Sequence, residues 1–256
     1  MNIETILSPA ELPALARRDL RSTACAVFDI LRATSTFVTA LHNGAKEVIP
    51  VCEIAEAVAF KNSEFGIRNS EFILLAGERA GVRIRAAQSG GVDFDFGNSP
   101  REFTPERVRG KTIVSTTTNG TRALRACAGA KTVLAASFLN LAATADFLRG
   151  EKEVLLVCAG TGEHPASEDI NAAGALVELL LENKDAPPKI SVNAHVAKTA
   201  FEVARDHFPN AIRDSENGRR LLAIPELRDD VAFCAQRDLF NLVAVMQADG
   251  ALRRMV

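Results

Sequence analysis

Short apolar runs rich in β-branched residues alternate along the chain with segments of helical period. Several of these runs are apolar throughout, which is typical of strands covered on both faces of a parallel sheet. The pattern predicts strands at residues 24–30, 47–51, 72–76, 112–116, 132–136, 154–159, 190–192 and 231–234. It predicts helices at residues 34–42, 54–61, 121–128, 141–148, 169–183 and 195–207. This alternation indicates an α/β protein, which we expect to be a three-layer α/β/α structure.

The end of the chain differs, because residues 242–254 have the pattern of a strand, an Ala-Asp-Gly turn and a second strand. We therefore expect a mixed, largely parallel sheet that gains an antiparallel C-terminal hairpin near its edge. The length fits one domain over residues 1–256. Pro187-Pro188 follows the longest predicted helix and indicates a place near 186–190 where two subdomains could divide.

Three connections carry local signals of their own. In Ser99-Pro100-Arg101-Glu102 the serine can cap a helix, the proline can occupy its first position and the glutamate can complete a capping box. Thr104-Pro105-Glu106 repeats the start signal, so the first of these helices is at most one turn. The sequence Asn-Ser-Glu-Phe occurs at 62–65 and again at 69–72, which indicates a helix-to-strand connection lengthened by duplication.

Composition and charge narrow the range of functions. The chain has 47% hydrophobic and 24% charged residues, as expected for a globular protein with a substantial core. Its 30 Lys and Arg against 32 Asp and Glu leave no excess positive charge, so we expect no nucleic acid partner. Residues 1–20 lack the apolar core of an export signal, and no apolar run approaches the roughly 20 residues that span a membrane. We expect a cytoplasmic protein with no membrane partner, and the sequence leaves open whether it forms a homo-oligomer.

The five cysteines lie far apart, at positions 25, 52, 127, 158 and 234, and form no Cys-x-x-Cys pair. Each has apolar neighbours. We therefore expect reduced thiols that act as small buried hydrophobic groups.

Polar residues gather where predicted strands end and lead into helices, which is where open α/β sheets bind ligands. The first such place follows strand 24–30 and contains Asp29, Arg32, Thr34, Ser35 and Thr36. A carboxylate beside a guanidinium and three hydroxyls could hold a metal ion and an anion together. On structural grounds alone, Asp29 could pair with Arg32 while a hydroxyl caps the next helix.

Two further places follow the same rule. Glu78 and Arg79 close the strand at 72–76, where an exposed ion pair would explain them equally well. Asn98 and Ser99 precede the short helix start, whose free amide hydrogens suit phosphate as well as ordinary capping.

The fourth place is the most polar, because a run of hydroxyl, amide and glycine residues separates strand 112–116 from the next helix. Core packing does not call for so many polar groups together, although threonine is also common in strands. Such a loop would supply neutral donors around a small anion. The candidate anion-binding residues there are Thr116, Thr117, Thr118, Asn119, Gly120 and Thr121.

The fifth place is the loop after strand 154–159, which leads to Glu168 and Asp169 at the start of a long helix. Acidic residues in a first helical turn favour the helix dipole, which is sufficient reason for them. They could also join Asp29 and Glu78 in an oxygen-rich Mg2+ site, which usually contains one or two carboxylates with water and substrate oxygens.

Taken together, five motifs resemble those of the 2-phosphosulfolactate phosphatase family, in the family's order and across most of the chain. They are Asp29-Ile-Leu-Arg-Ala-Thr-Ser-Thr36, Leu75-Ala-Gly-Glu-Arg79, Asp95-Phe-Gly-Asn-Ser-Pro100, Thr116-Thr-Thr-Asn-Gly-Thr-Arg-Ala-Leu124 and Ser167-Glu-Asp169 followed by Ala173-Gly174. The chain departs from the family pattern at residues 62–72, 86–91 and 163–166.

The resemblance implies an α/β fold, Mg2+ dependence and hydrolysis of the phosphate ester of sulfolactate, a step towards coenzyme M. On this hypothesis Asp29 and Glu78 are metal ligands, together with one or both of Glu168 and Asp169. Arg32 and Arg79 would hold phosphate, carboxylate or sulfonate oxygens of a small anionic phosphate-ester substrate. The departures leave open a related 2-phosphohydroxy acid as substrate. The alternative is a non-catalytic α/β module that binds a small anionic metabolite or nucleotide.

Overall fold

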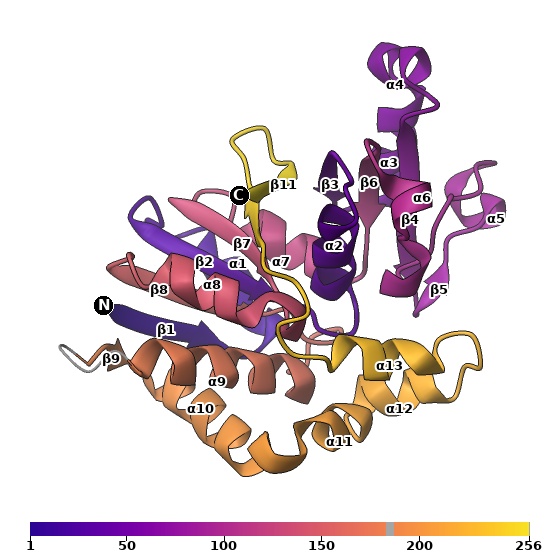
Figure 1. Cartoon of the computed structure of the whole chain (residues 1–256). Helices are drawn as coiled ribbons and strands as arrows, with labels where there is room; N and C mark the ends of the chain where they lie inside the picture. Colours follow the sequence, from indigo (N-terminus) through magenta and orange to yellow (C-terminus); the bar gives the residue numbers. More distant parts are fainter. Residues whose placement is uncertain (183–186, 256) are drawn as a thin grey trace.

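The computed structural model describes residues 1–182 and 187–255, and its central feature is a sheet of eleven strands (Figure 1). The strand order is β5-β4-β6-β3-β11-β10-β7-β2-β8-β1-β9. The bounds are β1 Asn2–Ile6, β2 Thr23–Phe28, β3 Glu47–Val51, β4 Ile73–Arg79, β5 Val82–Arg83, β6 Thr112–Thr116, β7 Thr132–Ala136, β8 Glu153–Cys158, β9 Lys189–Ile190, β10 Val243–Met246 and β11 Leu252–Met255.

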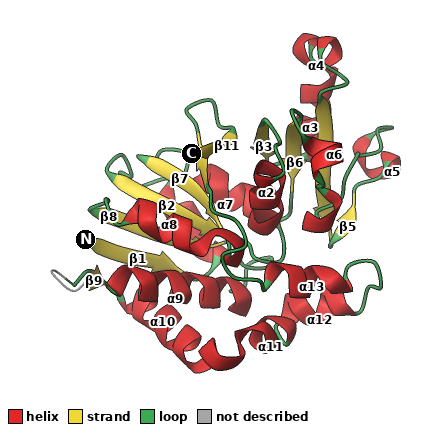
Figure 2. Cartoon of the chain, in the orientation of Figure 1, coloured by secondary structure: helices red, strands yellow, loops and turns green. Residues whose placement is uncertain are grey.

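Helices cover both faces of this sheet (Figure 2). Their bounds are α1 Leu12–Leu15, α2 Ala33–His42, α3 Ile54–Asn62, α4 Glu64–Arg68, α5 Ala86–Ser89, α6 Pro105–Val108, α7 Gly120–Ala126, α8 Leu141–Leu148, α9 Ser167–Leu181, α10 Val192–Ala204, α11 Phe208–Arg213, α12 Glu216–Leu222 and α13 Arg228–Cys234. Single 3-10 turns occur at Pro9–Glu11, Pro100–Glu102, Phe138–Asn140 and Arg205–His207.

Alternate residues of the inner strands point to different helical layers. In β2, Ala26 and Phe28 pack in one apolar cluster with α8 and α9, whereas Cys25 and Val27 pack in another with α2 and α7. Strands buried on both faces explain the apolar runs in the sequence. The predicted three-layer α/β/α fold with a mixed, largely parallel sheet is confirmed.

The sheet consists of two parallel blocks joined by the C-terminal hairpin. Strands β4, β6 and β3 are parallel to one another, and so are β7, β2, β8, β1 and β9. Between them, β3 pairs with β11, β11 with β10 and β10 with β7, each antiparallel. The hairpin was predicted correctly, but its expected place near the sheet edge is wrong.

Three successive antiparallel pairings reverse the strand direction from one block to the other. Because the sheet is also twisted, the blocks cross steeply rather than lying flat, and the strands of both run towards the region beside α13 (Figure 1). The carboxyl ends of both blocks therefore meet in one place.

Most predicted elements are confirmed, including strands 47–51, 112–116 and 132–136 and helix 141–148, whose observed bounds are the same.

The strand predicted at 231–234 is wrong, because these residues lie in α13. Asp229 and Asp230 in its first turn favour a helix, and Val231 and Cys234 share its buried face. Strand β1 was missed. The predicted helix end at Asn183 and residue 186 of the suggested subdomain division lie outside the described residues.

The two short helical segments near residue 100 begin at Pro100 and Pro105, but Ser99 does not cap the first one. Its hydroxyl donates to Asp230 Oδ1 at 2.7 Å instead, so the predicted capping box is wrong. The turn Pro100–Glu102 and helix α6 confirm the two successive starts.

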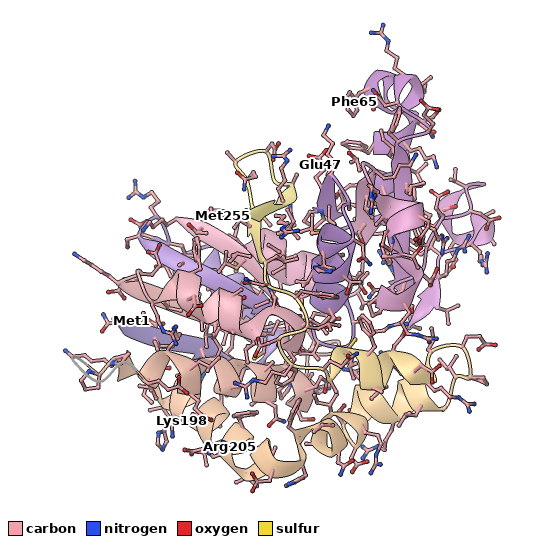
Figure 3. The ribbon with its side chains drawn as sticks, viewed as in Figure 1. Met1, Glu47, Phe65, Lys198, Arg205 and Met255 are labelled. Carbon is pink, nitrogen blue, oxygen red and sulfur yellow. The ribbon has the colours of Figure 1, made fainter. Side chains whose placement is uncertain are left out.

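The duplicated segment at 62–72 forms α4 and the turn that leads into β4, as predicted for a helix-to-strand connection. Figure 3 shows Phe65 on this part of the chain, which projects beyond the sheet. The cysteine prediction is confirmed for Cys25, Cys127, Cys158 and Cys234, which are free and buried; Cys52 is free but only half-buried.

A buried carboxylate ties the hairpin to its neighbouring block. Strands β11 and β3 share one paired position, Leu252 with Val48. Beside it, the buried Glu47 accepts hydrogen bonds from Arg253 Nε at 2.9 Å and from Thr112 Oγ1 at 2.9 Å. The ion pair therefore joins β11 to both β3 and β6.

We expect Arg253→Met to lower the free energy of unfolding by about 1–3 kcal/mol, because it leaves the Glu47 charge buried without its cationic partner. The matched control is Arg18→Met, since Arg18 is about as exposed as Arg253 but pairs with the half-exposed Glu4. That change should cost about 0–1 kcal/mol. Urea unfolding at neutral pH compares the two, and equal losses would contradict the role given to Glu47.

Candidate active site

A cleft of about 300 Å³ opens where the carboxyl ends of the two blocks meet. Asp29, which follows β2, and Glu78, near the end of β4, both line it. The loop at residues 160–162, which follows β8, and helix α12 complete its walls. Segments far apart in the sequence thus share a single cavity.

Asp29 is held in a nearly dry position at the base of α2. Its Oδ1 accepts a hydrogen bond from the backbone N–H of Ala33 at 2.9 Å. Burial raises the pKa of Asp29 to about 7, against the effect of the Ala33 N–H, and the negative charges of Glu78 and Glu168 add to the rise. The structure therefore keeps a carboxyl at the cleft that loses its proton near neutral pH.

Gly120 allows the loop at residues 116–121, the threonine loop, to approach this carboxyl. A Cβ at position 120 would lie 2.6 Å from Asp29 Oδ2 and 2.6 Å from the Cβ of Ala33. Neither neighbour can move freely, because Ala33 begins α2 and Asp29 is bonded to it. Only glycine fits this close contact between the start of α7 and the segment that joins β2 to α2.

Glu78 is fixed by three donors from two loops. Its Oε1 accepts hydrogen bonds from the N–H and the hydroxyl of Thr118 at 2.8 and 2.9 Å. Its Oε2 accepts one from the N–H of Gly81 at 2.7 Å. Glu78 therefore connects the end of β4 to the threonine loop, which is the part of the candidate anion site that reaches the cleft.

Asp169 joins the segments that follow the neighbouring parallel strands β2 and β8. Its Oδ1 accepts from the N–H of Ile30 at 2.8 Å, and its Oδ2 from the N–H of Gly160 at 2.9 Å. Burial, together with the charges of Glu168 and Asp29, raises its pKa well above the ordinary range. Glu168 is also buried, and its Oε1 accepts from Asn217 Nδ2 at 2.6 Å. Both acids lie behind the cleft wall rather than among the residues that line it.

The two candidate arginines are placed differently. Arg32 lines the cleft, and its guanidinium donates to Asp230 Oδ2 at 2.7 Å and to the carbonyl oxygen of Gly81 at 2.8 Å. Arg79 is not among the lining residues. Its guanidinium donates to its neighbour's carbonyl, to that of Cys52 and to the hydroxyl of Thr116, so it holds the ends of β3, β4 and β6 together.

The candidate hydroxyls form hydrogen bonds to other groups of the protein, some within their own loops and some to other segments. Thr34 and Ser35 bond to the backbone oxygens of Asp29 and Ile30, and Thr36 bonds to that of Asn98. Thr117 and Thr121 bond to each other. The residues of this candidate set that line the cleft are Asn98, Thr118 and Asn119.

Three residues of the region were missed in the sequence. Asp230 on α13 is fully buried and accepts from both Arg32 and Ser99. Asn217 and Arg220 on α12 line the cleft. The acidic pair Asp229-Asp230 is a helix-start signal that could have indicated this helix. It was missed because the apolar residues that follow it were predicted to be a strand.

Two side-chain oxygens of the cleft accept no hydrogen bond from the described residues. The side-chain Oδ1 atoms of Asn98 and Asn217 are buried without a hydrogen bond, and both residues line the cleft. Within residues 1–182 and 187–255, no group of three or more His, Cys, Asp or Glu side chains is arranged to hold a metal ion. Any cation here would therefore depend on fewer carboxylates, with amide, water or substrate oxygens.

The fold and cleft define an α/β protein with a cleft, lined in part by carboxylates, at the carboxyl ends of its strands. The family described as 2-phosphosulpholactate phosphatase matches residues 10–249. A probable 2-phosphosulfolactate phosphatase of Thermotoga maritima is 39% identical over 86% of this chain and 87% of its own. One of Clostridium perfringens is 36% identical over 95% of this chain and 92% of its own.

The chain belongs to the 2-phosphosulfolactate phosphatase family, and this confirms the resemblance drawn from its motifs. It is accordingly an enzyme of the phosphoric monoester hydrolase class. In the described part of the chain, no helix is both long enough and apolar enough to cross a membrane.

We expect Asp29→Asn to stabilise the metal-free protein above neutral pH. The folded pKa of Asp29, about 7, exceeds its ordinary value of 3.8, so this group's contribution to stability falls as pH rises from about 4 to 7. Asparagine keeps an acceptor for Ala33 but has no charge to bury. With chelator present, urea unfolding at pH 8 should show a gain of about 1 kcal/mol or more, and a smaller gain at pH 5.

The control is Asp19→Asn. Asp19 is exposed, and its hydrogen bonds with Arg21 lower its pKa to about 2, so removal of its charge should bring no stabilisation. A loss of stability at pH 8 in Asp29→Asn would contradict the view that the charged form of Asp29 destabilises the folded protein.

Proposed function

We propose that the protein hydrolyses the phosphate monoester of a small 2-hydroxy acid in a reaction that depends on Mg2+. The first candidate substrate is 2-phospho-3-sulfolactate, which would give 3-sulfolactate and phosphate. Family membership and the names of the relatives support the substrate class. The observation that carries the proposal is that Asp29 and Glu78, from separate blocks of the sheet, line one cleft.

The donor set suits Mg2+. This ion takes oxygen ligands and is usually bound by one or two carboxylates, with water and substrate phosphate completing its coordination. Asp29 and Glu78 would hold it, and the unpartnered Oδ1 atoms of Asn98 and Asn217 are oxygen donors beside them. Bound there, Mg2+ would offset negative charge on the phosphate oxygens. Glu168 and Asp169, which lie behind the residues that line the cleft, would add negative potential that favours a bound cation.

The other groups position the ester. Arg32 is held by Asp230 and Gly81, so its guanidinium has a fixed orientation in the wall of the cleft, where its remaining N–H groups can face a phosphate. Thr118 orients Glu78, and Asn119 holds the loop after β8 through the carbonyl oxygens of Ala159 and Gly162. Fixed donors of this kind favour phosphoryl transfer because that reaction depends on positioning and electrostatics.

Family membership favours the phosphatase over the non-catalytic binding module. A binding module would hold the anion with arginines and threonines and would leave the buried carboxylates without a role. In the structure most of the candidate hydroxyls bond to backbone carbonyl oxygens or to carboxylates of the protein, while the side chains of Asp29 and Glu78 line the cleft. The two acidic groups at the cleft therefore support a metal-dependent reaction over simple anion binding.

Phosphate release from 2-phospho-3-sulfolactate and 2-phospholactate, with Mg2+ and then with chelator, tests the proposal. We expect turnover that chelator abolishes and added Mg2+ restores. Asp29→Asn and Glu78→Gln should each lower kcat/KM by at least about 100-fold, because each removes a ligand. Glu216→Gln, an exposed acid of α12 outside the cleft lining, should behave as wild type. Turnover that chelator leaves unchanged would refute the metal role.

A further inference from the structure

Helix α12 brings an unpaired cation to the cleft. Arg220 is exposed and lines the cavity, and among the described residues its guanidinium has no carboxylate partner and no hydrogen bond. Arg32, the other lining cation, is paired with the fully buried Asp230. The charge of Arg220 is therefore available to a ligand, whereas that of Arg32 is largely offset within the protein.

The helix that carries Arg220 is anchored to the site. Asn217 lies three residues earlier and shares a helix face with Arg220. Its Nδ2 donates to Glu168 Oε1 and to Thr161 Oγ1, each at 2.6 Å. Leu221 is buried in the core beneath. These contacts fix the base of the Arg220 side chain at the cleft, while its end has no bond that a ligand would need to break.

Charge balance indicates what such a cation would bind. The carboxylates of Asp29 and Glu78 make one part of the cleft acidic, and in the proposed reaction a divalent cation there would face the phosphate. A substrate that has a sulfonate as well as a phosphate and a carboxylate carries a further negative charge that the acidic part of the cleft would repel. Arg220 comes from a different element, and its planar guanidinium matches the oxygens of a sulfonate or carboxylate.

We propose that Arg220 is a specificity-determining residue that binds the sulfonate of 2-phospho-3-sulfolactate, the acid group that this ester has in addition to its phosphate and its carboxylate. This inference rests on the proposed function, since it assigns the phosphate to the part of the cleft near Asp29 and Glu78. It gives the enzyme a physical means of preferring a sulfonated ester to the corresponding phospholactate.

Arg122 is the competing cation. It lies on α7, has no bonded partner among the described residues, and lines a neighbouring hollow with apolar residues such as Leu12 and Pro13. That hollow shares Asn119 and Gly162 with the cleft but contains neither Asp29 nor Glu78. The phosphate and the sulfonate belong to the same small molecule. We therefore expect the sulfonate in the cavity that Arg220 lines together with Asp29 and Glu78.

The test compares two esters that differ only in the sulfonate, 2-phospho-3-sulfolactate and 2-phospholactate. Arg220→Met should lower kcat/KM for the sulfonated ester by about 10- to 100-fold, chiefly through KM, and leave phospholactate unchanged. Arg219→Met is the matched control, because Arg219 is an exposed neighbour on the same helix that bonds to the carbonyl of Asp214. It should change neither reaction, and nor should Arg122→Met.

Equal losses with both esters would overturn the proposal, since they would place Arg220 at the phosphate or the carboxylate. A sulfonate-specific loss in Arg122→Met but not in Arg220→Met would overturn it as well. Calorimetric titration with 3-sulfolactate and with lactate gives a readout that needs no turnover. Wild type should bind 3-sulfolactate more tightly, and Arg220→Met should remove that preference. If wild type hydrolyses neither ester, the proposed function fails, while the titration still decides the role of Arg220.

Discussion

The position of one antiparallel hairpin determines how this protein builds its site. In an uninterrupted parallel sheet, all carboxyl ends lie along one edge, so residues at the ends of distant strands are far apart. Here β10 and β11 separate two parallel blocks and reverse the direction of one relative to the other. With the sheet twist, the two carboxyl edges face each other, and Asp29 and Glu78 reach the same cleft although 49 residues separate them.

This arrangement concentrates negative charge in a buried place, which opposes folding unless the charges are offset. The protein places N–H donors on these carboxylates: Ala33 for Asp29, Thr118 and Gly81 for Glu78, and Ile30 and Gly160 for Asp169. The same bonds tie strand ends to the following loops, so the groups that stabilise the charges also set the shape of the cleft. Burial nevertheless raises the pKa of Asp29 and of Asp169, which is typical of sites that bind or transform ligands.

Sequence patterns were most reliable where a segment's structure depended on its own residues. Strands 112–116 and 132–136 were predicted correctly because apolar, β-branched runs have few alternatives. The error at 231–234 has the opposite cause: four apolar residues suit a strand or one side of a helix, and contacts with the core decide between them. That error concealed Asp230, the partner that fixes Arg32.

The sequence by itself determined the α/β class, the family and the loops that carry polar groups, because local periodicity and motif order record them directly. Only the tertiary structure decided which of those groups line the cleft. Arg79, Asp169 and most of the threonine hydroxyls form bonds inside the protein, whereas Asn217 and Arg220, which no motif marked, line the cleft. The reason is that the direction of a side chain depends on the packing of elements distant in sequence, and here on a hairpin formed by the last residues of the chain.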